Sequence, residues 1–339
     1  METRKIQQVG GGTYTVSLPK EWATAADIEP GAVVALHSHI DGTLVVQTGV
    51  EREADPLALS VTDADPDTLE RTLQAAYTAG IDCIELDAPD GVTESTHRRV
   101  DRLTRALTGV TVTESDDDVV QVRSLLDVEE VSITQSVRQL QFAALSAHRE
   151  ATTGLTASPP AAPGGQDDQT DRIAAMVDHY FQRGLDSLSV MDALGLTRPA
   201  LFDRWVTACE LARVADHADR VAATADRLDG SVDPDLAADL DDLADRSRTL
   251  VEDAVGVVLD TDERGAPQRV LDARDTLLDD VRAFDRRLFE ADDADYRLTH
   301  AVDALRRTAE AAGRIAEVGL QSRLRDRCSS ASGDVGQLM

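Results

Sequence analysis

The stretch LARVADHADRVA, residues 211–222, returns near the end of the chain as LRRTAEAAGRIA, residues 305–316. The two copies are 94 residues apart without a gap, and Leu, Arg, Ala, Ala, Arg and Ala are identical at six aligned positions. Apolar residues recur at helical spacing in both copies. A motif that returns at a fixed offset indicates a duplicated structural unit.

Helical periodicity extends over the whole region around these copies, from about residue 127 onward. It predicts helices near residues 129–154, 170–193, 197–228, 233–260, 267–291 and 294–326. The repeated motif falls on the third and sixth of them, which predicts an all-α domain of two tandem three-helix bundles. We place this domain at 127–328, with repeats at about 127–228 and 233–327, followed by a disordered tail at 329–339. The low-complexity stretch ASPPAAPGGQDD, residues 157–168, predicts a flexible turn between the first two helices.

In the first fifty residues, apolar residues recur with a different period. In TYTVSLPKEW, residues 13–22, apolar side chains alternate with Thr and Ser, which predicts a strand that Pro19 ends. Residues 10–12 are glycines and predict a flexible or bulged approach to this strand. A helical turn at 21–26 and a hairpin at 33–46, turning at Asp41-Gly42, follow. A hairpin set of this size does not enclose a core alone, so this β domain, residues 1–50, is expected to dimerise.

Residues 51–126 mix both periods and predict a small α/β unit. Strands are expected at 57–61, 81–86, 110–113 and 119–122, and helices at 66–79 and 96–107. We find no motif in this segment that carries chemistry. The predicted fold class is therefore multidomain, with a β domain, an α/β unit and tandem helical bundles.

The charge balance is strongly acidic, with 63 Asp and Glu against 34 Lys and Arg and a formal net charge of -29. The only two lysines are Lys5 and Lys20. Such a surface stays hydrated in concentrated salt, where the screening length is about 3 Å at 1 M, and it resembles haloarchaeal proteins. Repulsion from nucleic acid and disorder are the alternatives. At high salt counterion release contributes little to DNA binding, so local contacts must do more.

Three isolated cysteines, Cys83, Cys209 and Cys328, form no CxxC motif and favour free thiols in a reducing cytoplasm. No signal peptide and no apolar stretch of about 20 residues occurs, so we expect a cytoplasmic protein without membrane insertion. We find no catalytic arrangement and expect no enzyme activity and no cofactor. His37 and His39 point from the same face of one predicted strand, and we expect that face to be exposed.

The N-terminal stretch, residues 3–47, resembles the AbrB/SpoVT swapped-hairpin domain. The resemblance rests on the basic start, the glycines, LPKEW at 18–22, IEPG at 28–31 and the closing hairpin. It implies an interleaved dimer that binds DNA, with Trp22 as an anchor of the dimer core. The residues that it implies for DNA contact are Arg4, Lys5, Tyr14, Ser17 and Lys20. The alternative for the cations is an ordinary solvated strand edge.

The helical repeat, over about residues 127–327, resembles PhoU proteins, regulators of phosphate uptake. The motif positions are Arg213, Asp216, His217, Arg220, Arg307, Glu310, Arg314 and Glu317. Some PhoU proteins bind metal clusters through an acid pair on these helices, but here the leading acid is replaced by Ala212 and Arg306. We therefore expect ion-pair ladders instead of a metal, with a divalent metal or iron cluster as the alternative. Glu210 lies on another helix face as a poor substitute, and His217 is expected on the helix surface.

Together these features predict a phosphate-responsive transcriptional regulator of phosphate uptake and homeostasis that binds DNA as a homodimer or higher oligomer. One alternative is an adaptor that inhibits a phosphate ABC transporter or a sensor component by protein contact, without binding DNA. A metal-storing protein or metal-dependent enzyme built on the bundles is a third reading.

Overall fold

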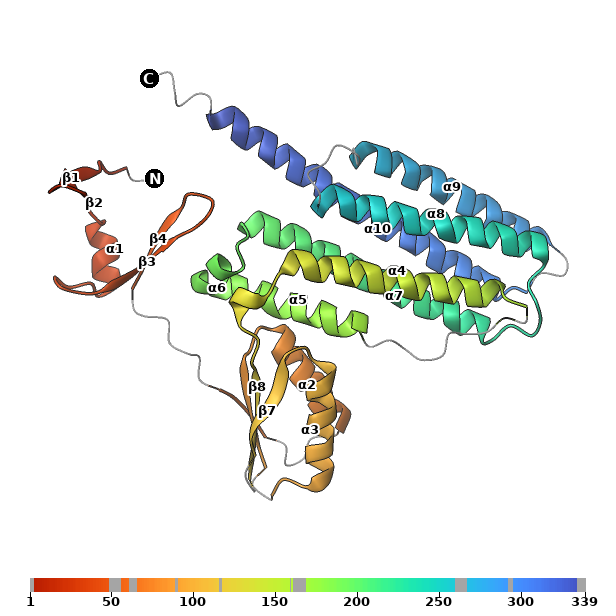
Figure 1. The fold of residues 1–339 in the computed structure, drawn as a ribbon, viewed down its shortest axis with the longest axis horizontal. Helices are drawn as coiled ribbons and strands as arrows, with labels where there is room; N and C mark the ends of the chain where they lie inside the picture. The colour runs from red at the N-terminus through yellow and green to blue at the C-terminus, as the bar shows by residue number, and fades with distance from the viewer. Residues whose placement is uncertain are drawn as a thin grey trace. The chain divides into compact units, whose positions relative to one another are not determined.

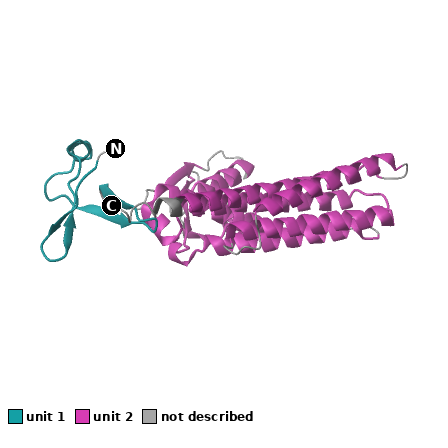
Figure 2. Ribbon diagram, turned by 90° about the horizontal axis from the view of Figure 1, so that it is seen from above, with its two compact units in different colours: residues 1–54 teal, residues 55–339 magenta. Residues whose placement is uncertain are grey.

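The computed structural model describes residues 3–48, 56–60, 66–88, 91–115, 118–158, 160, 169–259, 267–291 and 295–333. The chain divides into two compact units, residues 1–54 and residues 55–339 (Figure 2). The α/β segment and the helical segment belong to the same unit. The predicted turn at 157–168 falls largely outside the described residues, as does the end of the tail after Gly333.

The first unit begins with a hairpin that the sequence did not predict. Strand β1, Gln7–Val9, pairs antiparallel with β2, Thr13–Thr15. Glycines 10–12 therefore form the turn of a hairpin, and Gly10 has a φ of 64°, which glycine adopts without steric cost. The predicted strand is shorter than expected, because pairing with β1 stops at Thr15. Ser17 lies beyond the strand.

The rest of this unit follows the sequence pattern. Helix α1, Lys20–Ala25, begins directly after Pro19. Strands β3, Val34–Ser38, and β4, Leu44–Thr48, form the predicted antiparallel hairpin. At its turn, a carboxylate oxygen of Asp41 accepts a hydrogen bond of 2.9 Å from the backbone N–H two residues later. Gly42, which directly follows Asp41, has a φ of 83°, and this completes the tight turn.

The second unit opens with a four-stranded sheet in the order β5-β6-β8-β7. Strands β5 and β6 are parallel, and the other two pairs are antiparallel. Side chains from α2 and α3 pack against β6 and β8 and form a small core on one face of the sheet (Figure 1). The bounds are β5 Leu57–Ser60, α2 Pro66–Thr78, β6 Cys83–Asp87, α3 Glu94–Ala106, β7 Val110–Ser115 and β8 Val119–Ser124. The predicted α/β unit is present, with element ends shifted by at most two residues.

Seven helices follow in the described part of the chain, and Figure 1 shows the long ones lying lengthwise. Their contacts form two groups, one of α4, α5 and α7 and one of α8, α9 and α10. The groups meet mainly through α7 against α10 and α4 against α8, and one continuous apolar core runs through both. The bounds are α4 Ile133–Thr156, α5 Gln169–Asp186, α6 Leu188–Ala193, α7 Arg198–Ala225, α8 Pro234–Leu259, α9 Pro267–Glu290 and α10 Leu298–Gly333.

Several predicted helix limits were wrong. The helix expected at 170–193 is two helices, because Ser187 leaves helical geometry and its hydroxyl caps α6 by accepting from the Val190 N–H. The helix expected from 129 begins at Ile133, after a 3₁₀ turn at 128–130. The last helix continues to Gly333, so residues 329–333 are helical where a disordered tail was predicted.

The sheet is joined to the helices by a polar contact. His179, on α5, is fully buried, and its ring stacks on Tyr77 at 4.4 Å. Its Nδ1 lies 2.8 Å from the Tyr77 carbonyl oxygen, and its Nε2 lies 3.2 Å from a carboxylate oxygen of Asp82. Arg183, one turn along α5, pairs with the other oxygen of Asp82 at 3.1 Å. The α/β segment is therefore held against α5 by side chains from both sides.

Candidate functional site

The predicted DNA-contacting residues are all exposed in the first unit. Arg4 and Lys5 precede β1, and Tyr14 lies in the middle of β2. Ser17 follows β2, and Lys20 is the first residue of α1. Both lysines of the chain are thus exposed in the smaller of its two units.

The same unit has no buried apolar side chain among its described residues. Large apolar side chains are instead exposed on every element, including the short α1, where Trp22 is 37% exposed. A folded domain needs an apolar core, so these side chains require a covering surface. The exposed set is Ile6, Val9, Tyr14, Val16, Leu18, Trp22, Val33, Leu36, Ile40 and Leu44.

The histidines of β3 and its turn correct a prediction. His39 is buried, and His37 is half-buried, so they do not lie on an exposed strand face. A carboxylate oxygen of Asp41 lies 3.9 Å from His39 Nε2. The sequence pattern predicted this hairpin but not the burial of His39.

In the second unit, seven residues of the repeated motif line a single groove of about 470 Å³. The groove lies where α7 of the first helix group crosses α10 of the second. The structure thus brings together side chains that are about 94 residues apart in the sequence. The lining residues are Arg213, Asp216, His217, Arg220, Arg307, Glu310 and Arg314.

Glu210 links the two helices through two arginines that line this groove. Its side chain is buried, and it pairs with Arg213 on its own helix. Its second carboxylate oxygen lies 2.7 Å from an Nη2 of Arg314 on α10. Glu210 lies on another helix face than Ala212, as expected, but it shares a face with Arg213 three residues later.

The ion-pair ladder predicted on α10 is present in part. Arg306 pairs with Glu310 one turn later, and it also contacts Asp303 at 2.6 Å. Arg307 donates from Nε to the other Asp303 oxygen at 2.7 Å. The ladder predicted on α7 differs, since Arg213 pairs with Glu210 and not with Asp216.

His217 was expected on the helix surface, but it is buried at the floor of the groove. Its Nδ1 lies 3.3 Å from the Thr308 hydroxyl oxygen of α10. Burial first, and then the guanidinium groups of Arg220, Arg307 and Arg314, lower the pKa of His217 to about 4. The imidazole is therefore neutral at pH 7 and can accept or donate a hydrogen bond.

One motif residue lies outside the groove. Glu317 does not line it, and its carboxylate oxygen lies 3.3 Å from an Nη1 of Arg274 on α9. This pair ties α10 to α9 inside the second helix group. No group of three or more His, Cys, Asp or Glu side chains placed to hold a metal ion occurs among the described residues.

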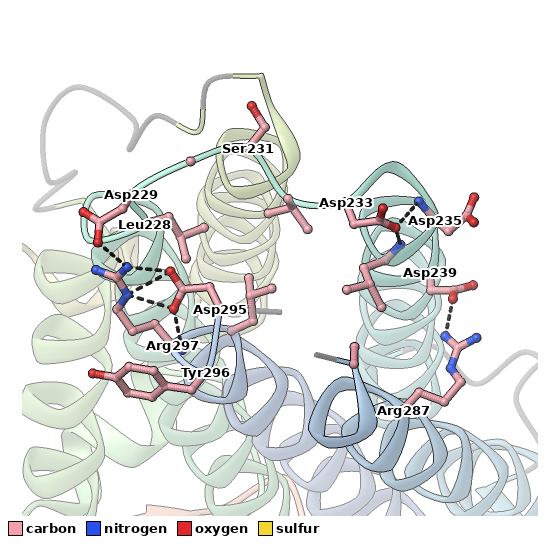
Figure 3. A pocket seen from close by; sticks show the side chains of 15 residues that line it. Leu228, Asp229, Ser231, Asp233, Asp235, Asp239, Arg287, Asp295, Tyr296 and Arg297 are labelled. Atoms are coloured by element: carbon pink, nitrogen blue, oxygen red, sulfur yellow. Dashed lines mark hydrogen bonds and ion pairs between the residues drawn. The ribbon is translucent and has the colours of Figure 1, made fainter. Parts of the chain in front are cut away.

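A second cavity, of about 870 Å³, lies at the ends of the helices (Figure 3). Its two arginines are occupied, since Arg287 pairs with Asp239 and Arg297 pairs with Asp229 and Asp295. Hydrogen bonds from Arg297 lower the pKa of Asp295. The five aspartates of this lining outnumber its two arginines, so it offers little to an anion.

Residues 7–53 match the family model described as antidote-toxin recognition MazE, bacterial antitoxin. This match supports the AbrB-like swapped-hairpin domain that the sequence predicts at the N-terminus. No curated protein matches the chain, and no solved structure matches it. The resemblance of the helical segment to PhoU proteins stays a prediction. In the described part of the chain, no helix is both long enough and apolar enough to cross a membrane.

Proposed function

We propose that the chain is a dimeric, DNA-binding regulator of phosphate uptake with no catalytic activity of its own. The observation that carries this proposal is the first unit, which exposes its apolar side chains and buries none of those described. Two hairpins and a helix of six residues are too small to be stable in that state. The hairpins of a second copy would cover these side chains, as the match over residues 7–53 suggests.

The distribution of charge supports DNA contact at this end. The chain has a net charge of -29, which repels nucleic acid, yet its only lysines lie within the first twenty residues. Pairing two copies would double the number of these cations on one surface. Arg4, Lys5 and Lys20 would contact phosphates and position the dimer, while Tyr14 and Ser17 lie on or next to β2.

In this proposal, the helical part of the second unit provides the response to phosphate. Its helices pack as two groups of three, and the motif positions that resemble PhoU proteins converge where α7 and α10 meet. A ligand that binds there alters the affinity for DNA only if its own affinity differs between two arrangements of the dimer.

The test is to capture the DNA bound to the full chain in cells grown with abundant and with scarce phosphate. Enrichment of phosphate-transport promoters that changes with phosphate is the expected result. The double variant Arg4→Ala with Lys20→Ala should lose that enrichment. Arg282→Ala, which removes an exposed cation on α9, should keep it. Equal enrichment for both variants would contradict the proposed DNA contact.

A second candidate is an adaptor that binds a partner protein and no DNA. The description of the matched family, antidote-toxin recognition, favours protein contact for this kind of domain. A phosphate transporter or sensor component is the partner that the helical resemblance suggests. Crosslinking in the same cells distinguishes the candidates, because the adaptor would recover a partner protein and no specific DNA.

A further inference from the structure

The walls of the groove between α7 and α10 are related by the repeat. With the offset of 94 residues, Arg213 corresponds to Arg307 and Arg220 to Arg314, and Asp216 corresponds to Glu310. Six of the seven lining residues therefore form three equivalent pairs, one member from each helix. The seventh, His217, has Ala311 as its counterpart and belongs to the floor.

The lining is rich in cations. It has four guanidinium groups against two carboxylates, a difference of two positive charges, with a neutral imidazole beneath. The whole chain carries a formal net charge of -29, so the groove contrasts with the rest of the protein. Glu210 and Asp303, outside the lining, pair with three of these arginines and offset part of the excess. A phosphate group, with about 1.5 to 2 negative charges at pH 7, is attracted to the positive charge and the donors that remain.

Much of the hydrogen-bonding capacity of these arginines is unused. A guanidinium has five N–H donors in a planar fork. Within the described structure, the side chain of Arg220 makes no hydrogen bond or ion pair, and Arg307 donates only from Nε. Glu210 pairs with Arg213 and Arg314 through one oxygen each. Two of the four guanidinium groups are thus held by this carboxylate, while most of the N–H donors of the four arginines make no hydrogen bond within the described structure.

We infer that this groove binds a phosphate-bearing anion, held between α7 and α10 by arginines of both repeats. Arginine forks match the geometry of phosphate oxygens and bind them through paired hydrogen bonds. The volume of about 470 Å³ is within the range of small-molecule sites and admits more than one phosphate group. The inference deepens the proposed function, on which it rests, by giving the effector a place in the helical unit.

The experiment is isothermal titration calorimetry on the full chain, without DNA, at constant ionic strength set with potassium chloride. Three probes distinguish the source of the phosphate group: inorganic phosphate, pyrophosphate and adenosine triphosphate without metal. Potassium chloride at the same ionic strength serves as the blank. We expect saturable binding of at least one probe, and the strongest one identifies the class of anion.

The decisive variant is Arg220→Gln, because this side chain makes no hydrogen bond or ion pair within the described structure. We expect its affinity for the bound probe to fall at least about tenfold, as for a lost charge-assisted hydrogen bond. Arg282→Gln on α9 removes one exposed positive charge away from the groove and should bind like the parent chain. Circular dichroism of both variants shows that the helices remain.

Two results would overturn the inference: no binding of any probe at about 1 mM, or equal affinity for Arg220→Gln and Arg282→Gln. Because no DNA is present, failure here leaves the proposed DNA binding intact. Conversely, if the double variant Arg4→Ala with Lys20→Ala still bound the anion, the inference would hold even if the DNA-capture experiment failed.

Discussion

At the scale of single residues, Glu210 decides how the two helix groups meet. Its carboxylate is buried, and its two oxygens pair with one arginine from each repeat. A buried carboxylate of this kind is favourable only while both partners are in place. Its counterpart in the second repeat is Ala304, so the link exists once and not twice.

Replacing Glu210 with Gln should lower the free energy of unfolding by about 1–3 kcal/mol, because two charge-assisted contacts lose their anion. The half-exposed state of both arginines keeps the loss in the lower part of that range. Urea denaturation followed by circular dichroism measures the effect. Asp279→Asn removes an exposed i, i+3 pair with Arg282 and should change stability by less than about 0.5 kcal/mol. A similar loss in both variants would contradict the bridging role.

His148 makes stability depend on pH. It is fully buried on α4, where its Nδ1 lies 3.3 Å from Nη1 of Arg248. Burial, followed by the charges of Arg248 and His217, lowers its pKa from 6.5 to about 3. Below pH 6.5 the unfolded chain therefore binds a proton that the folded chain does not. The contribution of His148 to stability is therefore constant above about pH 6.5 and is lost progressively as the pH decreases toward 3.

Between pH 7 and pH 5 this residue alone should reduce the free energy of unfolding by about 2 kcal/mol. His148→Gln should remove about that much of the pH dependence, whatever it costs in stability at pH 7. Urea titrations at the two pH values give the difference. His300→Gln, at an exposed position of α10, should leave the pH dependence at its parental value. An unchanged slope in His148→Gln would show that another group is responsible.

The repeat indicated which residues of α7 and α10 share a face, but not what surrounds them. Seven of the motif residues line one groove, because identical spacing puts equivalent residues on equivalent helix faces. It missed the burial of Glu210 and His217, since burial depends on which helix covers the face. The spacing of Glu210 and Arg213 was a usable local signal, as i, i+3 pairs share a face.

At the scale of elements, the approach of α10 to α8 depends on a glycine. A Cβ at Gly319 would lie 2.3 Å from Val257 Cγ1, a distance that side chains do not tolerate. Gly in a helix is otherwise less favourable than Ala by about 1 kcal/mol. The close packing of the two helices therefore explains why a glycine serves here.

Gly319→Ala should destabilise the protein by about 1–3 kcal/mol despite its better helix propensity, because α10 must move away from α8. Thermal unfolding measures the change as a lower Tm. Gly230→Ala is a suitable control, since a Cβ there meets no atom within 4 Å and its backbone is not in the left-handed region. If Gly319→Ala raised the Tm, the helices would have to be less closely packed than the structure shows.

Most elements were predictable because helices and strands have distinct periods and clear stop signals. Gly80 ended α2 as expected, with a φ of 85° and a hydrogen bond from the Ile81 N–H to the Ala76 oxygen. The first hairpin was missed because Gln7–Val9 is mostly polar and shows no alternation. The break at Ser187 was missed because apolar periodicity continues across it.

At the scale of the whole molecule, the exposed apolar side chains of the first unit predict self-association. Leu36→Asp introduces a charge on β3, where the leucine is 62% exposed in the single chain. We expect it to convert dimers to monomers in sedimentation experiments, while the helical circular dichroism signal stays the same. Thr43→Asp adds the same charge next to the β3–β4 turn and should remain dimeric. A dimer that persists in Leu36→Asp would place the self-association elsewhere.

The stacked ring of His179 has a thermodynamic consequence for residues 55–339. Unfolding of the sheet would remove Tyr77 and Asp82 from contact with His179, which is fully buried on α5. The surface of α5 that they cover would then become exposed at the same time. The sheet and the bundle should therefore absorb heat in one calorimetric peak, and no intermediate with a molten sheet beside intact helices should accumulate.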